Sequence, residues 1–292
     1  MKAIASSLGV LLALAIPLRA ADLPKLVFEE QPTDVKATKI VLIAGSTYFK
    51  PGEHDYVAGC AVLRDLLKQT PNVFPVLALD WPKKPETFAG AKAIVFLFDG
   101  GDKHGFLKDK RLEDLNKLSA TGVGFVNLHQ VIDVPNDLGD RIRQWNGAAW
   151  EKGYSQRAHW VHEFTTFPDH PICRGVTPFK IDDGWLTKLR FVAEKKGVTP
   201  LLRTVSPKSK AKETDDEAIV AWAYESTGQG KSFTFTGCHL HASFAEEGYR
   251  RLLVNGILWA AGVEIPKSGA PVKLDKDNLA QYLQKAPPAK KP

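Results

Sequence analysis

The chain has 292 residues, of which 25% are charged and 44% are hydrophobic. This balance excludes an intrinsically disordered chain, and the sequence has no Gly-X-Y repeat, heptad pattern or dense cysteine framework. The formal net charge is +6, yet residues 21–266 carry 31 basic and 31 acidic side chains. The excess lies in residues 1–20 and 267–292, so the neutral body argues against a nucleic-acid partner.

Residues 1–20 have the pattern of a secretory signal peptide. Lys2 precedes the apolar run 8–16, and the small residues Ala20 and Ala21 follow it. The run is shorter than the roughly 20 residues of a transmembrane helix, and no later stretch is longer, so we expect no membrane span. The alternative is a buried N-terminal helix. We predict an exported protein, periplasmic or extracellular, whose three cysteines allow at most one disulfide.

The body of the chain alternates strand-like and helix-like segments. Continuous apolar runs predict buried strands at residues 39–46, 73–79, 91–98 and 122–128. A 3.6-residue period predicts helices at residues 55–68, 109–119 and 246–261. Late runs predict a hairpin at residues 218–224 and 231–236.

This order predicts an α/β fold. We expect a doubly wound, mostly parallel sheet with helices on both faces and an irregular insert over residues 145–216. Within this insert we expect short strands at residues 159–164 and 201–205. No linker divides the body, so we predict one domain over residues 38–268. Residues 269–292 are rich in Lys, Pro and Ala, and we expect them to form a flexible, solvated tail.

Histidines gather at one edge of the predicted sheet. Ligands of open α/β sheets bind beyond the carboxyl ends of the strands. Five of the eight histidines lie at such positions: His54, His104, His129, His239 and His241. Imidazole is both a common metal ligand and a base at neutral pH, so this edge is the predicted site.

Some of these histidines also have a structural interpretation. His54 could belong to a cap of the following helix, and His104 lies in a glycine-flanked loop where it could face solvent. His129 directly follows a buried strand, where an imidazole without a partner would be unfavourable, which favours a function. His239 and His241 form H-x-H; in an extended chain both rings point to one side, as a metal site requires, but two hydrogen-bonded loop histidines fit as well.

The predicted insert is rich in aromatic residues. Its tryptophans either pack in the core or stack on sugar rings. One carboxylate of the pair Asp182-Asp183 could face a pocket, and the other is expected in a turn. The chain contains no Walker A sequence, G-x-G-x-x-G, G-x-S-x-G or H-E-x-x-H, so we expect no nucleotide cofactor and no hydrolase serine.

Several stretches occur in the order of a known family. They are KIVLIAGS…HDY, FLFDGGDKH, GVGFVNLHQVIDVP, AHWVHEF…DDGWLTKLRF and KSFTFTGCHLHASF…LWAAGVEIP. Over residues 38–268 the chain resembles the ThuA-like (trehalose utilisation) family, in particular its exported branch. The resemblance implies a flavodoxin-like sheet of the class I glutamine-amidotransferase type. It does not imply amidotransfer, because His129 stands where those enzymes have the nucleophilic cysteine.

The resemblance also assigns candidate residues. The positions that match the family pattern are His54, Asp99, Gly100, His104, His129, His159, Asp183, Trp185, His239 and His241. The chain departs from the pattern at Gly184 and Leu186, where the branch commonly has Glu and Tyr. It also has Cys238 where the branch often has Gly. These departures remove a carboxylate and a phenol from the expected substrate contacts.

Family members are linked to sugar metabolism, which implies a carbohydrate partner. We predict an exported carbohydrate-modifying enzyme, a lyase, isomerase or hydrolase acting on sugars or keto-sugars by proton abstraction. His239, His241 and His129 would bind a divalent metal such as zinc, and Asp183, His54 and His129 would be catalytic. Asp99, Gly100, His104, His159 and Trp185 would bind substrate. The alternative is a non-catalytic exported carbohydrate-binding protein of the same fold.

Overall fold

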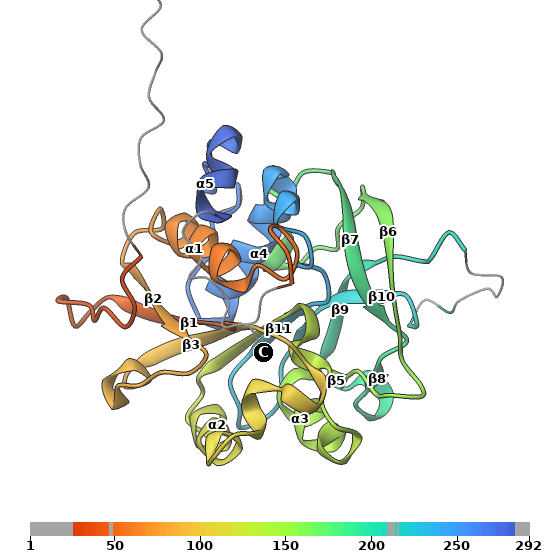
Figure 1. Cartoon of the computed structure of the whole chain (residues 1–292), viewed down its shortest axis with the longest axis horizontal. Helices are drawn as coiled ribbons and strands as arrows, with labels where there is room; N and C mark the ends of the chain where they lie inside the picture. Colours follow the sequence, from red (N-terminus) through yellow and green to blue (C-terminus); the bar gives the residue numbers. More distant parts are fainter. Residues whose placement is uncertain (1–25, 47–48, 209–213, 215, 284–292) are drawn as a thin grey trace, which may run out of the picture.

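The computed structural model describes residues 26–46, 49–208, 214 and 216–283 (Figure 1). The predicted signal peptide, residues 1–20, lies outside the described residues, as does the end of the predicted tail, residues 284–292. Within the part of the chain that the structure describes, no helix has the length and apolar character needed to cross a membrane.

A seven-stranded sheet forms the centre of the molecule. Its strands, in spatial order, are β2 (Val73–Leu79), β1 (Thr38–Ala44), β3 (Ala91–Leu97), β4 (Gly124–Leu128), β11 (Ser232–Phe235), β10 (Ile219–Tyr224) and β9 (Val198–Arg203). The first five are parallel, while β10 runs antiparallel to both β11 and β9. The predicted α/β, mostly parallel, flavodoxin-like sheet and its late hairpin are therefore confirmed.

Helices cover both faces of this sheet (Figure 1). The helices on one face are α1 (Tyr56–Leu67), α4 (Glu247–Ala260) and α5 (Leu279–Leu283); those on the other are α2 (Arg111–Ala120) and α3 (Gly139–Asn146). Strand β1 shows why the sheet is apolar on both sides: Ile40 and Leu42 join the core with α1, while Val41 and Ile43 join the core with α2. Burial on two faces produces a continuous apolar run.

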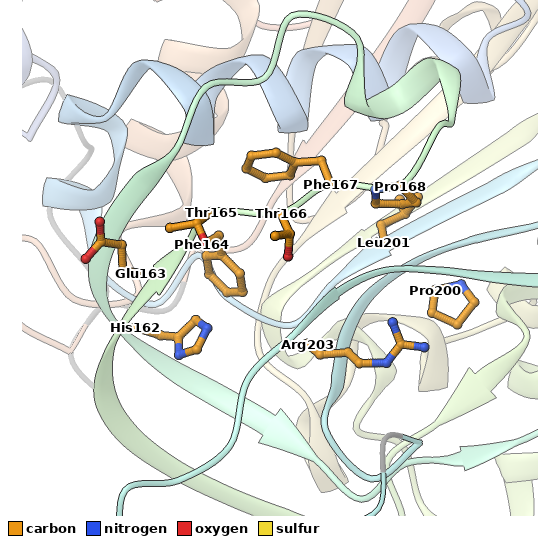
Figure 2. Close-up of a pocket in the computed structure, with 10 residues that line it drawn as sticks. All are labelled: His162, Glu163, Phe164, Thr165, Thr166, Phe167, Pro168, Pro200, Leu201 and Arg203. Carbon is orange, nitrogen blue, oxygen red and sulfur yellow. The ribbon is translucent and has the colours of Figure 1, made fainter.

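The predicted irregular insert contains ordered strands. Strands β6 (Gln156–Phe164) and β7 (Phe179–Thr187) pair antiparallel, and the short strands β5 (Ala148–Ala149) and β8 (Arg190–Phe191) form a second pair. The end of β6 and the edge strand β9 enclose a cavity of about 540 Å³ (Figure 2). His162 and Arg203 line it together with the buried side chains of Phe164 and Leu201.

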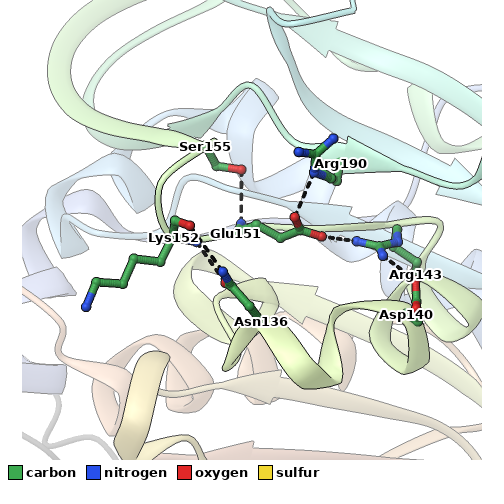
Figure 3. Close-up of polar contacts among 7 residues, drawn as sticks. All are labelled: Asn136, Asp140, Arg143, Glu151, Lys152, Ser155 and Arg190. Carbon is green, nitrogen blue, oxygen red and sulfur yellow. Dashed lines mark hydrogen bonds and ion pairs between the residues drawn. The ribbon is translucent and has the colours of Figure 1, made fainter.

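Glu151 joins the start of the insert to the helical layer (Figure 3). Its carboxylate pairs with Arg143 of α3 and, at 2.7 Å, with Arg190 of β8. Its backbone N–H donates to Ser155 Oγ at 3.0 Å. The Arg190 guanidinium also lies 3.9 Å from the ring centroid of Tyr154. These contacts fix the direction in which β6 leaves α3.

The segment after residue 268 is not a flexible tail over the part that the structure describes. Ala270, Val272, Leu279 and Tyr282 are all buried against the core that contains α1 and α4. Arg250 donates from Nε to the Val272 carbonyl at 3.1 Å, and the Tyr282 hydroxyl donates to Asp65 at 3.2 Å. The expectation for residues 269–283 is therefore wrong, because apolar residues spaced along a Lys-rich segment bury one side of it.

Candidate functional site

Three histidines from distant parts of the sequence meet at the carboxyl edge of the sheet. His54 precedes α1, His129 directly follows β4, and His239 follows β11. The Nε2 atom of His129 lies 3.2 Å from Nε2 of His54 and 3.3 Å from Nδ1 of His239. One ring nitrogen from each residue falls within 4.8 Å of the other two. We call these three residues the histidine cluster.

Neighbouring acceptors indicate the tautomers of His129 and His54, that is, which ring nitrogen carries the proton and which keeps a lone pair. His129 Nδ1 lies 3.1 Å from the Thr236 carbonyl, so Nδ1 carries the proton and donates it. His54 Nδ1 lies 3.1 Å from the Asp99 carboxylate, which also accepts from the Tyr56 hydroxyl. With both Nδ1 atoms protonated, the two Nε2 lone pairs face each other, an arrangement that a cation shared between them would stabilise.

The spacing fits a metal ion. Tetrahedral zinc holds imidazole nitrogens at about 2.0–2.1 Å, which separates two such nitrogens by about 3.3 Å. The distances from His129 Nε2 match this value. The Asp99–His54 and Thr236–His129 contacts have the form of the outer-shell hydrogen bonds that orient metal-bound imidazoles.

Burial keeps two of these imidazoles neutral. It lowers the pKa of His129 to about 3, with the neighbouring His54 adding to the shift. It also lowers the pKa of His239 to about 4, again with His54 contributing. Neutral imidazole is the form that coordinates a metal ion, so His129 and His239 are available as ligands at neutral pH.

The backbone is strained at this edge of the sheet. His54 has φ of 49°, His129 has φ of 60°, and Cys238, which precedes His239, has φ of 77°. Left-handed backbone is unfavourable for residues with a Cβ and persists only where surrounding contacts hold it. The sharp turn at His129 aims its ring across the ends of the neighbouring strands.

A cavity of about 650 Å³ opens over the histidine cluster. Its described walls include Phe49, Glu53, His54, His129, Gln130, Arg157, His159 and His239. Phe49 is 65% exposed and its ring packs edge-on against His54, with centroids 4.5 Å apart. This volume is suited to a small molecule the size of a sugar.

Residues of the insert complete the cavity. The His159 ring packs edge-on against the His239 ring with centroids 4.3 Å apart. Gly184 lies across from His159 in the β6–β7 pair, and a Cβ at this glycine would lie 3.0 Å from the His159 ring. Arg157 is held 3.5 Å from Asp133 and 4.6 Å from the Trp150 ring centroid. The missing side chain at residue 184 thus provides the space that the His159 ring fills.

His241 is not part of the histidine cluster. Leu240 is extended, but a 3₁₀ turn begins at His241, and only His239 of the H-x-H segment belongs to the cluster. The Nε2 atom of His241 lies 3.2 Å from the carbonyl of Leu279, in the segment that packs after residue 268. The predicted metal ligand His241 is therefore replaced by His54, which the sequence had suggested as a base.

Asp183 and Trp185 are both fully buried, although Trp185 is among the residues that line the cavity. The Asp183 carboxylate is fully buried and accepts backbone N–H groups, among them that of His239 at 2.8 Å. The Trp185 indole is also fully buried, donates to the Trp160 carbonyl and packs against Phe235. Neither the predicted base nor the predicted sugar-stacking surface is accessible, because both side chains belong to the interior.

The segment after β3 is mostly structural. His104 is fully buried; its Nε2 donates to the Val131 carbonyl at 2.7 Å, and its Nδ1 accepts the Phe106 N–H at 3.1 Å. A Cβ at Gly100 would lie 2.4 Å from the Gln130 carbonyl oxygen, so close packing requires glycine there. His104 and Gly100 are not among the residues that line the 650 Å³ cavity, whereas Asp99 contacts His54 directly.

Sequence reasoning missed several residues around the histidine cluster. Phe49 and Glu53 line the cavity, and Tyr56 donates to Asp99. Phe49 and Glu53 both precede His54 within five residues, so their closeness in sequence could have identified them as neighbours of the site. The Thr236 carbonyl is a backbone group, and no side-chain pattern could have identified it.

The fold and the histidine cluster define a flavodoxin-like α/β protein with a candidate metal site at the carboxyl edge of its sheet. The family model for ThuA, described as trehalose utilisation, matches residues 40–260. The chain belongs to this family. No curated protein sequence matches it significantly.

Solved structures that are similar to this chain share little sequence with it. A ThuA-like protein of Parabacteroides merdae aligns with a TM-score of 0.57 and 15% identity, over 85% of this chain and 99% of that chain. A ThuA-like protein of Bacteroides uniformis gives the same TM-score and identity, over 84% of this chain and 99% of that chain. The PurLQS structure from Thermotoga maritima aligns with a TM-score of 0.43 and 14% identity, over 77% and 97% of the two chains.

Proposed function

We propose that this protein is a carbohydrate-modifying enzyme that removes a proton next to the carbonyl of a keto-sugar, with a divalent metal ion bound by His54, His129 and His239. The observation that carries the proposal is the histidine cluster at the wall of a sugar-sized cavity. The family's link to trehalose utilisation supports a carbohydrate substrate.

The proposed chemistry divides the work among residues of the cavity. A divalent ion supplies a Lewis acid that polarises a carbonyl oxygen. His54 and Asp183 are poor candidates for the base, since His54 belongs to the histidine cluster and Asp183 is enclosed. His159 lines the same cavity beside His239 and is exposed, so we assign the proton-accepting role to its imidazole.

Amidotransfer is not part of the proposal. Burial raises the pKa of the Cys60 thiol, raises that of Cys173 to about 12, and raises that of Cys238 well above its ordinary value. A nucleophilic cysteine needs a lowered thiol pKa. The three thiols therefore lack the activation that glutamine hydrolysis requires.

Metal binding is the first test. We expect the purified protein to bind one zinc ion per chain, measured by elemental analysis and by titration against a chromogenic chelator. Single variants His54→Ala and His239→Ala should weaken binding by at least about 100-fold, because each removes a ligand. His162→Ala is the matched control, since His162 lies at the other cavity. Absence of binding, or equal binding by His54→Ala, would contradict the metal site.

Turnover separates an enzyme from a binding protein. The alternative is a carbohydrate-binding protein without catalysis, because Gly184 places no carboxylate beside His159. We expect the wild type to convert 3-keto-glycosides, monitored by loss of the keto-sugar, and His159→Gln to lose most of the rate while retaining zinc. Binding without turnover in the zinc-loaded wild type would favour the alternative.

Phe49 is the proposed sugar-stacking residue. Its ring is exposed at the cavity, whereas the tryptophans of the insert named above are buried. Phe49→Ala should raise KM for a keto-glycoside about 5- to 10-fold, equivalent to about 1–1.4 kcal/mol, with little change in the unfolding midpoint. Phe49→Tyr is the control and should retain the wild-type KM. An unchanged KM in Phe49→Ala would remove the stacking role.

We also propose that the protein is exported, to the periplasm or the medium. The proposal rests on the signal-like pattern of residues 1–20. Mass spectrometry of the protein recovered from cell fractions tests it. We expect a mature chain that lacks about 20 N-terminal residues outside the cytoplasm, and an uncleaved chain found only in the cytoplasm would contradict export.

A further inference from the structure

The turn that carries His239 needs an external support. Cys238 adopts left-handed backbone with φ of 77°, and the turn continues through His239 and Leu240 without joining a named strand. A residue with a Cβ pays roughly 1 kcal/mol or more for this conformation. The turn therefore keeps its shape only if contacts from another element hold it.

Besides the backbone of residues 53–54, which bridges to Leu240 and donates to the His239 carbonyl, Asp183 of β7 supplies such contacts. Its Oδ1 accepts the N–H groups of Gly184 and His239, both at 2.8 Å. Its Oδ2 accepts the N–H of Cys238 at 3.1 Å and the hydroxyl of Ser243 at 3.2 Å. Successive backbone N–H groups that converge on one anion form a nest, in which the anion determines the backbone conformation.

The remaining surroundings exclude a different role for this carboxylate. Asp183 is fully buried and its described partners are donors from the turn, the strand and Ser243. Asp183 is not among the residues that line the 650 Å³ cavity. Trp160, its register partner in the β6–β7 pair, is itself buried.

We propose that Asp183 is a positioning residue: its carboxylate fixes the turn that presents His239 to the histidine cluster. The inference rests on the metal site of the proposed function. The insert then has a defined role, because Asp183 lies on β7 of the insert and orients His239, which follows a strand of the central sheet. Asp183 acts on the metal through the backbone of residues 238–239, without touching the ion or the substrate.

The test is zinc affinity in Asp183→Asn, measured by chelator competition on the full chain. The amide keeps the size of the side chain but replaces one acceptor oxygen with a donor that opposes the N–H groups. We expect zinc to bind about 10- to 100-fold more weakly, the range found when an outer-shell partner is lost. Ser243→Ala removes one donor from the same carboxylate and should weaken binding about threefold.

A matched control separates positioning from general instability. Asn255 is fully buried and bonds to the Ile172 and Arg174 carbonyls on the far side of α4. Asn255→Ala should lower the unfolding midpoint without changing zinc affinity. If Asp183→Asn does not fold, the zinc affinity of Ser243→Ala is compared with that of Asn255→Ala, and this comparison tests the proposal. Zinc affinity in Asp183→Asn or Ser243→Ala no weaker than in the control would overturn the proposal.

Hydrogen exchange keeps this inference distinct from the metal proposal. In the metal-free protein, Asp183→Asn should lose amide protection at residues 238–240 while protection in β1 and β4 persists. A wild type that binds no zinc would reject the metal site alone. Unchanged protection of residues 238–240 in Asp183→Asn would reject the role of Asp183, whatever the metal result.

Discussion

His104 and His129 are both buried, yet their ring nitrogens face different partners. Both nitrogens of His104 bond to backbone groups, whereas Nε2 of His129 faces two other imidazoles. An imidazole with both nitrogens satisfied by the backbone holds a loop in place. An imidazole with a lone pair directed at other lone pairs is suited to bind a cation.

The pH dependence of stability should reveal His104. Burial lowers its pKa to about 4, so between pH 6.5 and 4 the unfolded chain binds a proton that the folded chain does not. Stability is therefore complete above pH 6.5 and falls as the pH drops through this window, by on the order of 2–3 kcal/mol. Urea unfolding at a series of pH values measures this loss.

The variant His104→Gln isolates the contribution. Gln can donate to the Val131 carbonyl and accept from the Phe106 N–H, but it does not titrate. We expect its stability to fall by less than that of the wild type between pH 6.5 and 4. His241, whose pKa is also lowered to about 4 by burial, still titrates in both proteins. Identical pH slopes would show that His104 titrates normally in the folded state.

Individual site residues were predictable, but their grouping was not. His54, His129 and His239 each follow a strand, which identified them from the sequence. Their convergence depends on a spatial order that places β11 beside β4, and no local pattern encodes that neighbour. His241 lies outside the cluster because a 3₁₀ turn begins at this residue, which the H-x-H spacing does not reveal.

At the scale of elements, the parallel strands were predictable and the insert only in part: the expected short strands at residues 159–164 and 201–205 overlap β6 and β9. Apolar runs located β1 to β4 within about two residues, since burial on both faces requires apolar side chains at every position. Strand β6 begins with the exposed residues 156–159 and lacks this signal. Its first half is a strand because it pairs with β7, a contact that propensity alone does not reveal.

Helix α4 offers a test in which two effects oppose each other. Replacing Gly256 with Ala favours the helix by about 1 kcal/mol through propensity. A Cβ there would lie 2.2 Å from the ring of Phe233 in β11, so the helix or the ring must move. Overpacking costs about 1–3 kcal/mol, and we expect Gly256→Ala to destabilise the protein by about 1–2 kcal/mol net.

Urea unfolding measures the net effect, with α2 as the reference. Asn116 is exposed in α2, where Asn116→Ala changes propensity alone and should stabilise slightly. A gain in stability from Gly256→Ala equal to that from Asn116→Ala would mean that α4 and β11 separate without penalty.

At the scale of the whole molecule, residues beyond 268 also pack against the core of the domain. The segment up to residue 283 crosses α1 and α4 and buries Val272, Leu279 and Tyr282. Its Leu279 carbonyl receives His241 from the turn beyond the histidine cluster. Residues 269–283 thus support the segment that leads from the candidate site into α4.

Truncation tests this support. A chain that ends at residue 268 should be less stable than one that ends at residue 283 by on the order of 3 kcal/mol or more, since several apolar side chains lose their burial. Thermal unfolding of the two truncated proteins measures the difference. Equal midpoints would indicate that the packed segment adds no stability.

The histidine cluster has a consequence for the thermodynamics of the chain. The structure has three free cysteines and therefore no disulfide. An ion bound by His54, His129 and His239, as we propose, would tie together segments 75 and 110 residues apart in sequence as a reversible cross-link. Mass action makes such a link worth about 2.7 kcal/mol when free ion exceeds its dissociation constant 100-fold. Zinc-loaded and chelator-treated samples then differ in melting temperature, and unfolding curves are comparable only at a fixed concentration of free metal.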